Sequence, residues 1–133
     1  MKISFAVVSL VAALVLPGSA DDTELGKKME ELNEHYKSIR REDDPAKGAI
    51  SAREAQKLVA ASLNMTPAML TQMKDGPAKQ NALAIYRQMM GQSYVLLCQI
   101  EQAYLAKDMD KVKELYDQLK SVRKDGHDKF IEK

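Results

Sequence analysis

Two residues near opposite ends of the sequence, Met29 and His127, have side chains that could bind a metal ion. Met29 carries a soft thioether sulfur, and His127 carries an imidazole nitrogen, which is a common ligand of transition metals. Both residues fall on apolar stripes of segments with helical spacing, His127 at the edge of its stripe. Each alone is more simply explained as core filler or as a hydrogen-bonded side chain. Together, on facing helices, they could hold a metal between them.

Four segments repeat their apolar residues at the spacing of an amphipathic helix. They cover about residues 24–40, 45–64, 79–106 and 109–131. The chain is rich in helix-forming residues, and no segment has a convincing strand pattern. Two short turns and one longer link join the four segments, which predicts an all-α fold, an antiparallel up-down-up-down four-helix bundle.

Local signals predict where the first two helices begin. Asp22 or Thr23 can cap the first, and Asp44 can cap the second, which starts at Pro45. We expect the inward stripe of the second helix to contain Ile50, Ala55, Leu58, Val59 and Ser62.

The longer link, residues 64–78, contains three methionines spaced four apart. Thr66 could cap a single helical turn within it, from residue 67 to residue 73. The methionines are Met65, Met69 and Met73. Thioethers in an exported protein can bind copper(I), but apolar cover for the open end of the bundle or for a cofactor is the simpler interpretation.

The first twenty residues have the pattern of a secretory signal peptide. Lys2 supplies the positive charge, residues 3–16 form the apolar run, and small residues precede a cleavage site after Ala20. The run is too short to span a bilayer. We therefore expect residues 1–20 to be removed and residues 21–133 to form a soluble periplasmic protein with no membrane anchor.

Charge and cysteine content restrict the function of the mature chain. Without Lys2 it carries 19 basic and 19 acidic residues, which argues against nucleic acid as a partner. Cys98 is the single cysteine, so no intramolecular disulfide can form; a buried inert thiol is the simpler expectation, and an intermolecular disulfide or a reactive thiol the alternative. We find no hydrolase triad, phosphate loop or zinc-protease motif, so we expect one monomeric domain and no enzyme.

The residues around Met29 and His127 resemble the cytochrome b562 family of periplasmic haem proteins. The matching positions are residues 25–33, 99–100, 111–114 and 118–120, together with Arg123 and His127. In that family a methionine that ligates the iron stands at the place of Met29, and a histidine that ligates it stands at the place of His127. The resemblance spans the mature chain in the same order.

This resemblance implies one haem b between Met29 and His127, and electron transfer with a redox partner protein whose identity stays open. A family arginine that pairs with a haem propionate corresponds to Arg123. Covalent c-type attachment needs two cysteines beside a histidine, so the haem should be noncovalent.

The chain departs from the family pattern near the expected haem. Gly126 replaces an aromatic residue, and Met89 and Ser93 stand where the family packs aromatic rings. Glycine within a helix costs about 1 kcal/mol. A haem-free bundle of the same fold, acting as a binding or stress protein, therefore remains the alternative, with copper(I) bound by the three methionines of the long link as one form of it.

Overall fold

The computed structural model describes residues 23–131, and within that range it contains helices and no strand. The helices are α1 (Glu24–Arg41), α2 (Pro45–Ser62), the single turn α3 (Ala68–Thr71), α4 (Pro77–Leu105) and α5 (Met109–Phe130). The four long helices are those predicted from the sequence. The predicted signal peptide, residues 1–20, lies outside the described part of the chain.

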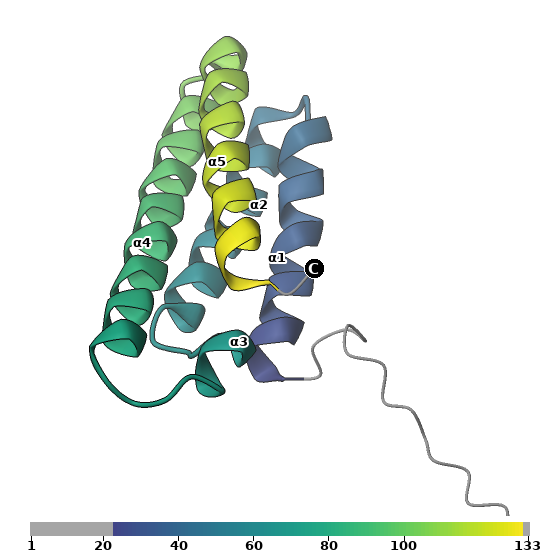
Figure 1. The fold of residues 1–133 in the computed structure, drawn as a ribbon. Helices are drawn as coiled ribbons and strands as arrows, with labels where there is room; N and C mark the ends of the chain where they lie inside the picture. Colours follow the sequence, from purple (N-terminus) through teal and green to yellow (C-terminus); the bar gives the residue numbers. More distant parts are fainter. Residues whose placement is uncertain (1–22, 132–133) are drawn as a thin grey trace, which may run out of the picture.

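The four long helices lie antiparallel to their neighbours in the order of the chain (Figure 1). The most extensive packing joins α2 to α4, α4 to α5, and α1 to α2, whereas α1 and α5 touch only sparsely. The short helix α3 packs against α4 at the end of the bundle where α1 begins. The predicted antiparallel four-helix bundle is confirmed. Among the described helices, none is both long and apolar enough to cross a membrane.

Side-chain caps explain where three of the long helices begin. The Thr23 side chain accepts a hydrogen bond from the backbone N–H of Gly26, and Asp44 accepts from two N–H groups at the start of α2. Asp108 accepts from the N–H of Lys111 at the start of α5. Each cap satisfies a backbone donor that has no partner within its helix. The Thr66 cap was wrong, because Pro67 is the N-cap of α3 and no side chain bonds there.

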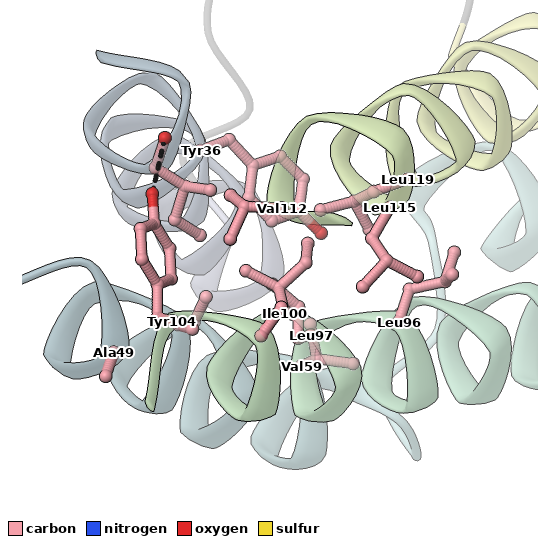
Figure 2. Packing of buried hydrophobic residues seen from close by; sticks show 14 of the residues in the cluster. Tyr36, Ala49, Val59, Leu96, Leu97, Ile100, Tyr104, Val112, Leu115 and Leu119 are labelled. Atoms are coloured by element: carbon pink, nitrogen blue, oxygen red, sulfur yellow. Dashed lines mark hydrogen bonds between the residues drawn. The ribbon is translucent and has the colours of Figure 1, made fainter. Parts of the chain in front are cut away.

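The core lies between all four long helices. Its buried members include Leu32, Tyr36, Ile39, Ala52, Ala55, Val59, Leu97, Ile100, Tyr104, Val112, Leu115 and Leu119 (Figure 2). The buried face of α2 consists mainly of small residues, so its backbone approaches the neighbouring helices closely. The prediction for Ile50 was wrong: its side chain is 61% exposed, because it lies one residue, about 100° of rotation, beyond the buried Ala49.

Candidate functional site

A hydrogen bond between α5 and α1 marks how these two helices are aligned. Arg123 Nη2 donates to Asn33 Oδ1 at 2.5 Å, and the two residues are 90 positions apart in the sequence. Both side chains are half-buried. Because α1 and α5 run in opposite directions (Figure 1), moving one turn toward the start of α1 and one turn toward the end of α5 leads to the same level of the bundle.

The residues reached by that step are Met29 and His127, which are the two candidate metal ligands. Each is four positions from a member of the hydrogen-bonded pair and is rotated from it by about 40° around its own helix. Met29 is rotated from Asn33 toward the buried stripe of α1, whereas His127 is rotated from Arg123 away from the buried stripe of α5. The fold thus brings the two candidates to one level on one side of the bundle.

Met29 and His127 differ in burial. Met29 is half-buried and packs against the hydrophobic core, as expected for a residue on the inner stripe. The side chain of His127 is exposed on one side, but partial removal of water by the surrounding protein lowers the pKa of its imidazole. The nearby charge of Arg123 lowers this pKa further, whereas the charge of Asp128 raises it. The imidazole is therefore favoured in the neutral form, which is the form that binds a metal ion.

A layer of polar side chains lies about one turn closer to the middle of the bundle, along the helix axes, than Met29 and His127 do. Besides the Asn33 and Arg123 pair, it contains Tyr36 of α1, whose phenol shares a side-chain hydrogen bond with Ser93 of α4. Tyr36 and Ser93 are 5% and 7% exposed. Burial raises the pKa of Tyr36, although the nearby Arg123 charge opposes this, so the phenol remains neutral. The apolar spacing of α1 identifies Tyr36 only as a core residue, and no pattern in the sequence singles out Asn33.

The position of Gly126 explains how the chain fills the space next to His127. A Cβ atom built on Gly126 would lie 3.7 Å from Met89 Cε, so the flexible thioether of Met89 covers the glycine from α4. Nearby, Tyr86 and Phe130 pack edge to face with ring centroids 5.7 Å apart. Aromatic side chains therefore occur at this end of the bundle, but at Tyr86 and Phe130, while Ser93 remains part of the deeper polar layer.

The other candidates lie elsewhere. Met65 and Met73 are half-buried on either side of α3, and Met69 in α3 is 40% exposed. Cys98 is half-buried, so it is less enclosed than its apolar sequence neighbours suggest. Within residues 23–131, no three His, Cys, Asp or Glu side chains gather into a cluster that could hold a metal ion. Among the described residues, Met29 and His127 are thus the metal-binding candidates that the fold aligns with each other.

Comparison with known proteins identifies a family. A family model described as Cytochrome b562 covers residues 24–130, which is most of the chain. No curated protein matches the chain.

Proposed function

Because this chain belongs to the cytochrome b562 family, a family of haem-binding electron-transfer cytochromes, we propose that it binds one haem b between Met29 and His127 and carries single electrons. The observation that carries the proposal is the Arg123 to Asn33 hydrogen bond, which marks the relative level of α1 and α5. That bond supports a common level for one thioether and one imidazole on two adjacent helices. These are donors suited to the two axial positions of a haem iron.

The packing of the bundle fits such a group. Since α1 and α5 touch only sparsely, a flat apolar ring could lie between them with little loss of helix packing. Met29 already packs against the core, whereas the exposed imidazole of His127 has room to reorient. Cys98 is the single cysteine of the sequence, so the double thioether linkage of c-type haem is excluded and binding would be noncovalent.

The proposed ligands favour electron transfer over catalysis. When bound, the haem would supply a reversible one-electron change of its iron. With Met29 and His127 as ligands, both axial positions would be filled, which leaves no open position for a substrate. Thioether ligation raises the reduction potential relative to ligation by two histidines. Arg123, one turn from His127, would offer N–H groups to a haem propionate.

The proposal includes export to the periplasm as a monomer that meets a redox partner protein. The signal-peptide pattern of residues 1–20 supports the export. Removal of these residues would leave a mature chain with equal numbers of basic and acidic side chains. With no net charge, association with a partner should depend on local surface patches rather than on long-range attraction.

A visible spectrum of the mature protein, recorded oxidised and reduced during titration with haem, tests the proposal. We expect saturation at one haem per chain with a low-spin, six-coordinate spectrum. His127→Ala should abolish that spectrum, and Met29→Ala should weaken haem binding and lower the potential. His35→Ala and Met69→Ala are the matched controls, because they remove the same donor types elsewhere.

Two outcomes would contradict this assignment. Unchanged spectra in both ligand variants would show that other residues hold the iron. If the wild-type protein took up no haem, the chain would be a haem-free member of the fold, and binding of copper(I) by Met65, Met69 and Met73 would be the next measurement.

A further inference from the structure

The guanidinium of Arg123 lies beside two side chains that α1 presents on one face. Asn33 and Tyr36 are three positions apart, so they are neighbours on the helix surface. Asn33 Oδ1 accepts a hydrogen bond from Arg123 Nη2 at 2.5 Å. The phenol of Tyr36 is close enough for the positive charge of Arg123 to influence it. The arginine of α5 is therefore held from α1 rather than extended into solvent.

The phenol of Tyr36 also interacts with Ser93 of α4. The Ser93 hydroxyl donates its single proton to the backbone carbonyl of Met89, with an Oγ to O distance of 3.0 Å. The interaction of Ser93 with Tyr36 lowers the pKa of the phenol, so it opposes the effect of burial. Figure 2 shows the ring of Tyr36 enclosed by the core, which restricts its movement.

Holding Arg123 in this way leaves part of its binding capacity free. A guanidinium has five N–H donors, and Asn33 takes one of them. The remaining donors lie one turn from His127, where they can bind an anionic group. Because a long side chain loses rotamer freedom when it binds a ligand, prior ordering by Asn33 and Tyr36 reduces the cost of binding.

We propose that Asn33 and Tyr36 are positioning residues, which hold the Arg123 guanidinium ready for a carboxylate of the bound haem. The proposal rests on the proposed function and adds residues that the sequence analysis did not assign to the site. It gives the polar layer a role: the layer orders a cation before the ligand arrives.

The main test compares haem with its dimethyl ester, in which both carboxylates are blocked. We expect Asn33→Ala to raise the Kd of the mature protein for haem about tenfold, and to leave the Kd for the ester almost unchanged. In an Arg123→Leu background, Asn33→Ala should have no further effect on haem binding, because the group that it positions is gone. Asn64→Ala, an exposed asparagine after α2, is the matched control.

Tyr36→Phe tests the second positioning residue. It keeps the buried ring but removes the hydroxyl that the Arg123 charge influences, so we expect a smaller rise in the Kd for haem, about threefold, and none for the ester. Tyr94→Phe is the control, since Tyr94 is exposed on α4.

Urea unfolding of the haem-free protein tests the contact between Asn33 and Arg123 without the ligand. Asn33→Ala should lower the free energy of unfolding when Arg123 is present, and should have no further effect in the Arg123→Leu background.

Three results would overturn the proposal. An equal loss of affinity for haem and for the ester would show that Asn33 and Tyr36 only support the fold. Additive effects of Asn33→Ala and Arg123→Leu would show that the two residues act independently. Absence of haem binding by the wild-type protein would remove both this proposal and the proposed function, whereas the first two results leave haem binding through Met29 and His127 intact.

Discussion

The ring of Tyr104 occupies the space into which a side chain at Gly48 would project. A Cβ atom built on Gly48 would lie 2.2 Å from Tyr104 Cε1, far inside contact distance. The hydroxyl of this fully buried tyrosine donates to the carbonyl of Ile39 at 2.8 Å (Figure 2) and lies 3.3 Å from that of Glu42. Because Gly48 has no side chain, Tyr104 of α4 can pass over α2 and donate a hydrogen bond to the end of α1.

We therefore expect Gly48→Ala to destabilise the protein. Alanine is the better helix former, but its methyl group would have to displace a buried ring that is held by hydrogen bonds. Overpacking of this kind costs about 1–3 kcal/mol. Urea unfolding of the haem-free protein measures the change in the free energy of unfolding.

Gly91→Ala provides the matched control for this substitution. A Cβ atom there would meet no neighbour within 4 Å, so the helix propensity of alanine should stabilise α4 by up to about 1 kcal/mol. Equal changes in the free energy of unfolding for the two substitutions would contradict the packing argument, because the ring of Tyr104 would then have no effect at Gly48.

Gly126→Ala should stabilise α5 next to the proposed ligand His127. The added Cβ atom would lie 3.7 Å from Met89 Cε, which is an ordinary van der Waals contact. Replacing a helical glycine gains roughly 1 kcal/mol. We expect a higher thermal midpoint of the haem-free protein and undiminished haem affinity.

Two measurements separate the causes in this variant. Differential scanning calorimetry gives the thermal midpoint, and a haem titration gives the affinity. A stabilised variant with much weaker haem binding would mean that the flexibility of α5 at Gly126, rather than its stability, is what haem binding requires.

Cys98 should react slowly with alkylating reagents near neutral pH. Burial raises the pKa of its thiol, the charge of Glu101 raises it further, and a hydrogen bond with Tyr94 opposes both. A raised pKa means a smaller thiolate fraction at a given pH, and the thiolate is the reactive form. The rate with iodoacetamide should therefore rise only as the pH increases beyond the range of an ordinary cysteine.

Removing the nearby charge should shift this profile. Glu101→Gln is expected to lower the pKa of Cys98, so alkylation at a fixed pH becomes faster, whereas Glu114→Gln, exposed on α5, should have no effect. Because Glu101 Oε2 also accepts a hydrogen bond from Gln56 at 2.7 Å, the amide of the variant can keep a similar contact. An unchanged profile in Glu101→Gln would show that the charge of Glu101 does not control the reactivity of the thiol.

The four long helices and the starts of α1 and α2 were predictable from the sequence because their causes are local. Thr23 and Asp44 cap the helices that immediately follow them, and apolar residues recur within each helix at its own period. The error at Ile50 has the opposite origin. Which side of α2 faces inward is decided by the helices packed on it, and they select the small residues instead of the large apolar one.

The sequence by itself also determined which side chains could bind a metal, since the donor types of Met29 and His127 do not depend on the fold. Only the tertiary structure decided that they share a level of the bundle and that Asn33 holds Arg123. That contact joins residues 90 positions apart, and no local rule relates them. Its existence depends on the relative alignment of two whole helices, which is set by the packing of the complete core.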